Sequence, residues 1–407
     1  MPVTSSPTYQ FGSFRLEVGE RRLLREGSIV PLRTKVFETL CVLVAHSGRL
    51  LTKHELMQSI WPDTAVEENN LNHNISTLRR ALGEDATGQR FIETVPRVGY
   101  RFLPDVVGGP GTATGLAPAP PAPPERSMRQ EIRFATATDG VRIAYSTVGN
   151  GLPLVKAANW LNHLEFEWDS PVWRHWIHQI SARHLFVRYD ERGCGLSDWQ
   201  VPELSFESWI RDLETVVDAL GLKRFALMGI SQGGAVASTF AARHPDRVSH
   251  LILYGTYARG WQHRGDPKAI EARDAIIKLV RLGWGRNNPG FQHMFSTRFI
   301  PDAGPEQMAW FNDLQRLSAS PENAARFMED FGYIDVRDIL HTVRAPTLVL
   351  HSQGDVVVPF DEGRVLAAGI PGARFVPLPS RNHLVLDNEP AWQIILNELG
   401  EFLGWPK

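Results

Sequence analysis

Residues 108–124 read GGPGTATGLAPAPPAPP, and this segment constrains the fold more than any other part of the chain. Proline lacks the amide donor that helices and sheets need, and the small side chains bury little apolar surface. The segment cannot contribute to a packed core and is therefore expected to be a linker. We predict two domains, residues 1–105 and 128–407, joined by a Gly/Pro/Ala-rich linker over residues 106–127.

The composition is that of a globular protein, with 43% hydrophobic and 22% charged residues. The net charge of −2 excludes a global basic field, so nucleic-acid binding needs a local patch. Cys41 and Cys194 fall in different predicted domains, which excludes a disulfide framework and a cysteine-built zinc site. No metal or cofactor is expected. The chain shows neither a signal-like start nor an apolar run of about 20 residues, so we expect a cytoplasmic protein without a membrane partner.

The first domain combines short strands with three helices. Alternating apolar and polar residues predict strands over 9–18, 21–25 and 28–32. Apolar residues at helical spacing predict helices over 34–46, 53–60 and 69–82. Thr52, with Glu55 three residues later, has the pattern of a capping box at the start of the second helix. Residues 91–102 predict two strands with a turn near 96–99.

This order is typical of a winged helix-turn-helix domain, an α+β fold. Four segments carry a resemblance to the DNA-binding domain of OmpR/PhoB-type response regulators over residues 9–104: LLTKHEL (50–56), WP (61–62), NISTLRRALG (74–83) and TVPRVGYRF (94–102). The resemblance implies that double-stranded DNA is a partner, with the third helix in the major groove and the hairpin beside it. The candidate DNA contacts are Asn72, His73, Ser76, Thr77, Arg79 and Arg80 on the helix, and Arg97 and Arg101 on the hairpin.

Charge does not make this domain a strong general DNA binder. Over residues 1–105, Lys and Arg exceed Asp and Glu by one, so non-specific affinity should be modest and salt-dependent. The alternative is that the domain binds only protein. Winged-helix proteins commonly occupy paired half-sites, which makes a homodimer an open expectation.

The second domain alternates short apolar strands with helices, which predicts a mostly parallel α/β sheet covered by helices on both faces. The alternation lapses over residues 256–340, which are mainly helical in pattern and form a predicted cap insertion. Six aromatic residues stand out in this insertion: Trp261, Trp284, Phe291, Phe295, Trp310 and Phe311. They favour an apolar acyl or aromatic substrate, or they only attach the cap to the core.

The sharpest motif is GISQG, residues 229–233, in which an apolar strand ends at Gly229 and a helix begins after Ser231. A serine on such a tight turn is exposed at a helix N-terminus, where the dipole favours a developing negative charge. Serine needs a base, and the base needs an orienting carboxylate. Asp355 follows one predicted strand and His383 follows another, with Asp361 as the only rival to Asp355.

Together with DERGCGLS (190–197), these residues resemble the alpha/beta hydrolase superfamily over residues 130–405. The resemblance implies that Ser231 is the nucleophile, His383 the general base and Asp355 its orienting carboxylate. It implies an oxyanion hole made by the backbone N–H of Gln232 and a second N–H from the loop after strand 154–157. That loop usually carries His-Gly, but here it reads Ala-Asn-Trp, and Trp160 is the predicted donor.

We therefore predict a serine hydrolase, in the first place a carboxylesterase acting on a small-molecule ester or other acyl compound, fused to a DNA-binding domain. Amides, thioesters, lactones and carbon–carbon cleavage stay open as reactions. The alternative is a transcriptional regulator whose hydrolase fold serves mainly as a ligand sensor. A third hypothesis makes the N-terminal domain an accessory of the enzyme.

Overall fold

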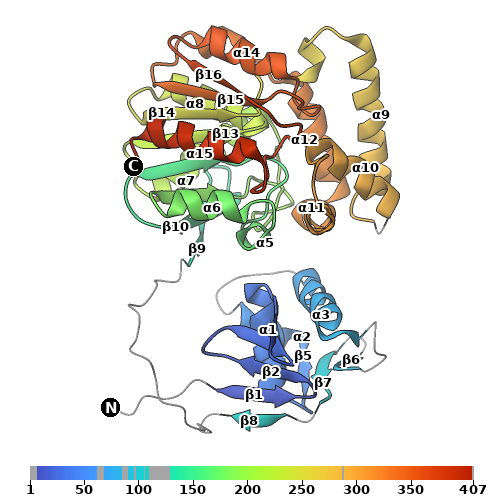
Figure 1. Ribbon diagram of the computed structural model, residues 1–407. Coiled ribbons are helices and arrows are strands. Elements are labelled where there is room, and N and C mark those ends of the chain that lie inside the picture. The colour runs from blue at the N-terminus through green and yellow to red at the C-terminus, as the bar shows by residue number, and fades with distance from the viewer. Residues whose placement is uncertain are drawn as a thin grey trace. The chain divides into compact units, whose positions relative to one another are not determined.

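The computed structural model describes residues 7–61, 68–84, 90–95, 98–104, 106–109, 129–286 and 288–405. The chain divides into two compact units, Met1–Glu125 and Arg126–Lys407 (Figure 1). Across the described ranges, no helix has both the length and the apolar character that crossing a membrane requires.

An antiparallel five-stranded sheet opens the first unit, with strand order β4-β3-β2-β1-β8. Its first four strands are β1 (Thr8–Phe11), β2 (Phe14–Glu17), β3 (Arg22–Arg25) and β4 (Ser28–Val30). The prediction of one strand over residues 9–18 is wrong, because the chain reverses between Phe11 and Phe14. Gly12, with φ +53°, allows this turn, and the alternation of apolar residues continues on both sides of it.

Strand β8 (Val107–Gly109) completes that sheet and lies inside the segment predicted as linker. It pairs antiparallel with β1, with Gly108 opposite Tyr9. The sheet therefore continues past the predicted domain end at residue 105. Backbone pairing needs no large side chains, which is why a glycine-rich stretch can still add a strand. Residues 110–127 of the predicted linker lie outside the described residues.

Three helices and a small second sheet complete the first unit: α1 (Thr34–Ala45), β5 (Leu50–Thr52), α2 (Lys53–Ile60), α3 (Glu68–Leu82), β6 (Ile92–Val95) and β7 (Gly99–Phe102). The predicted capping box is confirmed. Glu55 N donates to Thr52 Oγ1 at 3.1 Å and Thr52 N donates to the Glu55 carboxylate at 2.8 Å. The second sheet has the order β5-β7-β6, so Leu50–Thr52 adds a strand to the predicted hairpin. The apolar faces of α1 and α3 pack into one buried core.

The second unit contains an eight-stranded sheet with the order β16-β15-β14-β13-β11-β12-β10-β9. The strands are β9 (Glu131–Thr136), β10 (Arg142–Val148), β11 (Pro153–Ala157), β12 (Leu185–Tyr189), β13 (Phe225–Ile230), β14 (Val248–Tyr254), β15 (Thr347–Ser352) and β16 (Arg374–Leu378). Strands β11 to β16 run parallel to one another. Strand β10 runs antiparallel to both of its neighbours, β9 and β12. Every residue of β13 and β15 is buried, as expected for parallel strands covered on both faces.

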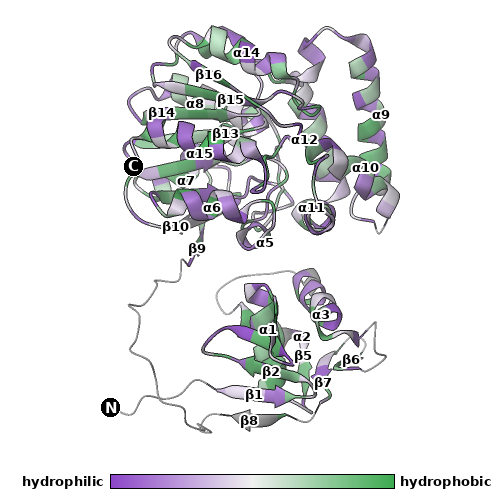
Figure 2. Ribbon diagram, in the orientation of Figure 1, coloured by the Kyte–Doolittle hydropathy of each residue, from purple (hydrophilic) through white to green (hydrophobic). Residues whose placement is uncertain are grey.

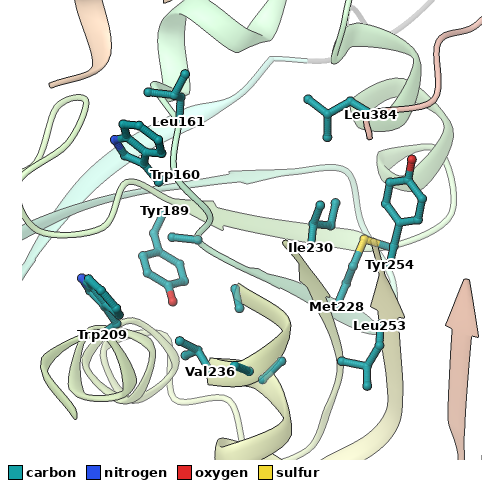
Figure 3. Packing of buried hydrophobic residues seen from close by; sticks show 14 of the residues in the cluster. Trp160, Leu161, Tyr189, Trp209, Met228, Ile230, Val236, Leu253, Tyr254 and Leu384 are labelled. Carbon is teal, nitrogen blue, oxygen red and sulfur yellow. The ribbon is translucent and has the colours of Figure 1, made fainter. Parts of the chain in front are cut away.

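Helices cover this sheet: α5 (Leu164–Trp168), α6 (Arg174–Ser181), α7 (Phe206–Ala219), α8 (Gln232–Arg243), α13 (Arg337–Leu340), α14 (Phe360–Gly369) and α15 (Pro390–Leu403). The central strands are hydrophobic along their length, whereas the helices alternate hydrophobic and hydrophilic residues (Figure 2). Figure 3 shows the resulting packing, with Met228 and Ile230 of β13 beside Leu253 and Tyr254 of β14.

Between β14 and α13 the chain forms one short 3-10 helix and four longer α-helices: η1 (Trp261–His263), α9 (Pro267–Gly283), α10 (Pro289–Phe299), α11 (Pro305–Ser318) and α12 (Pro321–Tyr333). They gather at one side of the sheet (Figure 1). A proline occupies the first turn of each of the four helices, where its missing amide costs no hydrogen bond. We refer to residues 256–340 as the cap.

Candidate active site

Ser231 lies on a strained turn between β13 and α8. Its backbone has φ 52° and ψ −131°, which is costly for a residue with a side chain. Close packing around the turn holds it there: a Cβ on Gly229 would lie 2.4 Å from Gly234 Cα, and one on Gly234 would lie 2.1 Å from Thr256 Oγ1. The Thr256 hydroxyl donates to the Ser231 carbonyl oxygen. The predicted strand–turn–helix setting of Ser231 is therefore present.

His383 and Asp355 meet at the same end of the sheet. The distance between His383 Nδ1 and Asp355 Oδ2 is 2.6 Å, and both residues are buried. Asp355 Oδ1 accepts the backbone amides of Val357 at 2.8 Å and Val358 at 3.0 Å. His383 Nε2 has no hydrogen-bond partner among the described residues. This nitrogen is the one that a general base would use.

Asp361, the rival carboxylate, does not reach the histidine. Its side chain is 78% exposed and pairs with Arg364, one turn along α14, at 3.3 Å. The alternative is therefore not supported by the arrangement of side chains, because His383 already contacts Asp355.

Contacts from β14 and from the cap fix the position of His383. The Tyr254 hydroxyl donates to the His383 carbonyl oxygen at 2.7 Å and accepts the amide of Val385 at 2.9 Å. The His383 amide donates to the carbonyl of Phe299, at the end of α10, at 2.8 Å. The Phe299 ring meets the imidazole edge-on at 5.6 Å between ring centroids. The loop that carries His383 is therefore held from two sides.

The two expected oxyanion donors, the backbone N–H groups of Gln232 and Trp160, differ in their hydrogen bonding. Gln232 is the first residue of α8, and an N–H at this position has no acceptor inside its own helix. The amide of Trp160 donates to Gln232 Oε1 at 3.1 Å, so the predicted second donor is already bound to a side chain. Gln232 Nε2 in turn donates to Glu191 at 2.9 Å. Burial raises the pKa of the Glu191 carboxyl well above its ordinary value.

The Gln232 side chain and Glu191 were not predicted. Glu191 belongs to the segment DERGCGLS, and its burial and its contact with Gln232 indicate a role beside the tight turn. The Trp160 prediction is corrected to this extent: in this structure its backbone N–H supports Gln232 and does not stand free beside Ser231.

Ser231 opens into a pocket between the sheet and the cap. The pocket holds about 650 Å³ of space outside the atoms, including its open mouth. Its apolar lining includes Trp160, Trp261, Ile276, Phe295, Phe299, Met328 and Phe331. Of the six aromatic cap residues singled out in the sequence, Trp261 and Phe295 line the pocket. The others pack elsewhere; for example, Trp310 stacks on Phe166 at 5.1 Å.

Some of the predicted DNA-contacting residues on α3, the third helix of the first unit, are exposed to solvent. Asn72, Ser76 and Arg80 are exposed, and His73 and Thr77 are half-buried. Asn72 Oδ1 also accepts the Tyr100 hydroxyl at 2.7 Å. Arg97 lies outside the described residues.

Two of the predicted DNA-contacting arginines have internal partners. Arg79 donates to the carbonyl of Ile92 at 2.8 Å and to Thr94 Oγ1 at 2.7 Å, so it attaches α3 to β6. Arg101 pairs with Glu93 of the neighbouring strand at 3.1 Å. Both side chains therefore have a structural explanation that involves no DNA.

Comparison with known families agrees with both folds. Residues 160–390, more than half of the chain, match the model of the alpha/beta hydrolase fold. The chain therefore belongs to the alpha/beta hydrolase family. Residues 27–102 match the model of the C-terminal domain of transcriptional regulatory proteins. Both resemblances inferred from the sequence are confirmed.

Individual relatives are hydrolases of several kinds. The AB hydrolase superfamily protein YisY of Bacillus subtilis is 28% identical over 254 residues, which are 61% of this chain and 91% of that protein. A putative carbamate hydrolase, RutD of Azorhizobium caulinodans, is 29% identical over 239 residues, 56% of this chain and 83% of that protein. Among solved structures, a thermophilic esterase from Thermogutta terrifontis is 28% identical with a TM-score of 0.55. That match covers 67% of this chain and 98% of the esterase.

Proposed function

We propose that the C-terminal domain hydrolyses carboxylic esters, with Ser231 as nucleophile, His383 as general base and Asp355 as its orienting carboxylate. The 2.6 Å contact between His383 Nδ1 and Asp355 carries this proposal, together with His383 Nε2, which has no hydrogen-bond partner in the part of the chain that the structure describes. The identity shared with an esterase of known structure supports ester hydrolysis as the reaction class.

The reaction follows from these positions. As the Ser231 hydroxyl attacks the ester carbonyl carbon, its proton passes to His383 Nε2. The carbonyl oxygen becomes an oxyanion, which the backbone N–H of Gln232 at the start of α8 stabilises. The bond to the leaving alcohol breaks and His383 returns the proton to that alcohol. Water then attacks the acyl-enzyme by the same route and releases the acid and Ser231.

The strained turn serves this chemistry because it fixes the nucleophile before the substrate arrives. The backbone of Ser231 is fixed relative to β13 and α8, because Gly229 and Gly234 let these two elements pack closely together. A fixed nucleophile loses little freedom on reaching the transition state.

Hydrolysis of 4-nitrophenyl esters of increasing chain length tests this proposal. Ser231→Ala should remove turnover and leave the thermal unfolding temperature unchanged, because the substitution deletes one oxygen that faces the pocket. Turnover near the wild-type rate in Ser231→Ala would refute the triad. Lack of turnover of every ester by the wild type would favour the alternative of a ligand-sensing regulator.

We also propose that the N-terminal domain binds double-stranded DNA through α3, because Asn72, Ser76 and Arg80 are exposed on one helix of a regulatory-type domain. Arg80→Ala should weaken binding and reduce its salt dependence, since a guanidinium–phosphate contact releases counterions. Arg15→Ala is the matched control, because Arg15 lies on β2 of the five-stranded sheet and not on α3. Equal DNA affinity of the wild type and Arg80→Ala across salt concentrations would show that Arg80 does not contact the phosphates.

A further inference from the structure

Three arginines from separate parts of the cap line the pocket that holds Ser231. Arg264 follows η1, Arg273 lies on α9 and Arg298 lies on α10. The described residues of the pocket lining include neither aspartate nor glutamate. The result is a cluster of positive charge inside a mainly apolar pocket, which the predicted ester hydrolysis does not itself require.

The protein neutralises this cluster only in part. Arg298 forms no ion pair with any described residue, and Arg273 donates to a neutral acceptor, the carbonyl of Val357, at 2.8 Å. Arg264 lies 3.7 Å from Glu362, but Glu362 also pairs with Arg259 at 2.9 Å. One carboxylate therefore serves two guanidinium groups, and the other two pocket arginines pair with no carboxylate in the described ranges.

Keeping these charges together is costly. Burial, together with the neighbouring charges of Arg298 and Arg264, lowers the pKa of Arg273 to about 10. Asp355 also acts on Arg273 electrostatically, but its carboxylate is already bound by His383 and two amides. Desolvated cations without counterions destabilise a folded protein unless a ligand supplies the missing charge.

A second observation points to a polar ligand in the same place. The Tyr257 side chain lines the pocket and is 5% exposed, and its hydroxyl has no hydrogen-bond partner among the described residues. Its ring lies 5.3 Å below the Arg264 guanidinium. A buried donor of this kind is expected to be satisfied in the functional state.

We propose that the pocket binds a substrate with an apolar chain and a carboxylate at the end remote from the scissile ester, and that Arg273, Arg298 and Arg264 hold this carboxylate. The inference rests on the proposed function, because it names the class of ester. A carboxylate matches the planar fork of a guanidinium, and its single charge suits the apolar walls better than a dianion does.

Two esters with the same acyl chain test the proposal. Mono(4-nitrophenyl) suberate has a free carboxylate and is anionic, whereas methyl 4-nitrophenyl suberate has this carboxylate methylated and is neutral. The chain is long enough that the free carboxylate does not attack its own ester. We expect the wild type to favour the anion in kcat/KM by about tenfold or more, because charge-assisted hydrogen bonds are involved. Arg298→Gln and Arg273→Gln should each remove most of this preference, measured as the ratio of kcat/KM for the anionic ester to kcat/KM for the neutral ester.

Arg281→Gln is the matched control, because Arg281 lies on α9 outside the pocket and pairs with Glu329 at 2.8 Å. It should leave both rates unchanged. Arg298→Lys keeps the charge and should retain part of the preference, which separates loss of charge from misfolding. No preference in the wild type, or equal loss on both esters in the glutamine variants, would overturn the proposal.

Calorimetric titration with octanoate and with octyl phosphate separates this inference from the proposed function. Octanoate binding that weakens in Arg298→Gln supports the anion site even if neither ester is hydrolysed. Hydrolysis without anion preference and without octanoate binding refutes the anion site alone. Octyl phosphate binding about tenfold tighter than octanoate would replace the carboxylate by a phosphate and overturn the class named here.

Discussion

Asp355→Asn is the substitution that tests the proposed triad most directly. The Asp355 carboxylate accepts hydrogen bonds from His383 and from the amides of Val357 and Val358. In the asparagine variant, the two backbone amides require the single remaining oxygen. The new NH2 group then faces His383 Nδ1, which must become an acceptor. The imidazole proton moves to Nε2, and this nitrogen can no longer remove a proton from Ser231.

The magnitude follows from that change of tautomer. Replacing the orienting carboxylate of a serine triad by its amide lowers kcat by about 10⁴ while the geometry is retained. This loss corresponds to about 5 kcal/mol in the activation free energy. The free energy of unfolding should change far less, because asparagine has nearly the same shape and keeps at least one backbone contact.

Initial rates with a 4-nitrophenyl ester at saturating concentration give kcat for both proteins, and thermal unfolding checks the fold. Asp361→Asn is the matched control, because that carboxylate is exposed and lies away from His383. It should leave kcat unchanged. A kcat for Asp355→Asn within tenfold of the wild type, or equal losses in the two variants, would refute the reasoning.

Two further predictions concern stability. Arg192→Met should lower the free energy of unfolding by about 3–5 kcal/mol, because it leaves buried Asp212, now bonded at 2.7 Å, without its counterion. Arg243→Met, which breaks an exposed pair with Glu207, should cost less than about 1 kcal/mol, and equal effects in urea titrations would contradict this. The second prediction is a pH effect: burial lowers the pKa of His175 from 6.5 to about 4. The folded state thus binds fewer protons than the unfolded state, and stability should fall as the pH drops from about 6.5 towards 4. Unfolding of His175→Gln across this range should show a shallower decline, and an identical slope would remove His175 as the cause.

Local patterns in the sequence predicted much of both folds. The helical faces of α1 and α3 were predictable because their apolar residues recur at one fixed spacing, and those residues form the core. The relation of Ser231 to β13 and α8 was predictable because the turn needs glycine at defined positions. The proximity of Asp355 and His383 was predictable because each follows a strand, and parallel strands bring their carboxyl ends together.

Features that depend on contacts between distant segments were not predictable. The reversal at Gly12 was missed because the alternation of apolar and polar residues continues through the turn. Strand β8 was missed because pairing at the edge of a sheet depends on backbone hydrogen bonds and not on side-chain composition. Asn72, Arg79 and Arg101 looked alike as DNA contacts until their partners on the hairpin were known. The pocket arginines Arg264, Arg273 and Arg298 carry no motif, since only the folding of the cap brings them together.

The hydrogen bond from the His383 amide to the Phe299 carbonyl has a consequence for how the cap of this alpha/beta hydrolase fold can diversify. Together with the bond from Thr256 to the Ser231 carbonyl, it ties the cap to both sides of the reaction centre. Insertions near Thr256 or Phe299 would displace Ser231 or His383. Apolar side chains on the pocket face of α9, such as Ile276, form no hydrogen bonds that would hold them to the site, whereas Arg273 on the same helix donates to the carbonyl of Val357. New specificities should therefore arise by point substitutions on α9, and not by changes in the length of the cap near its tied ends.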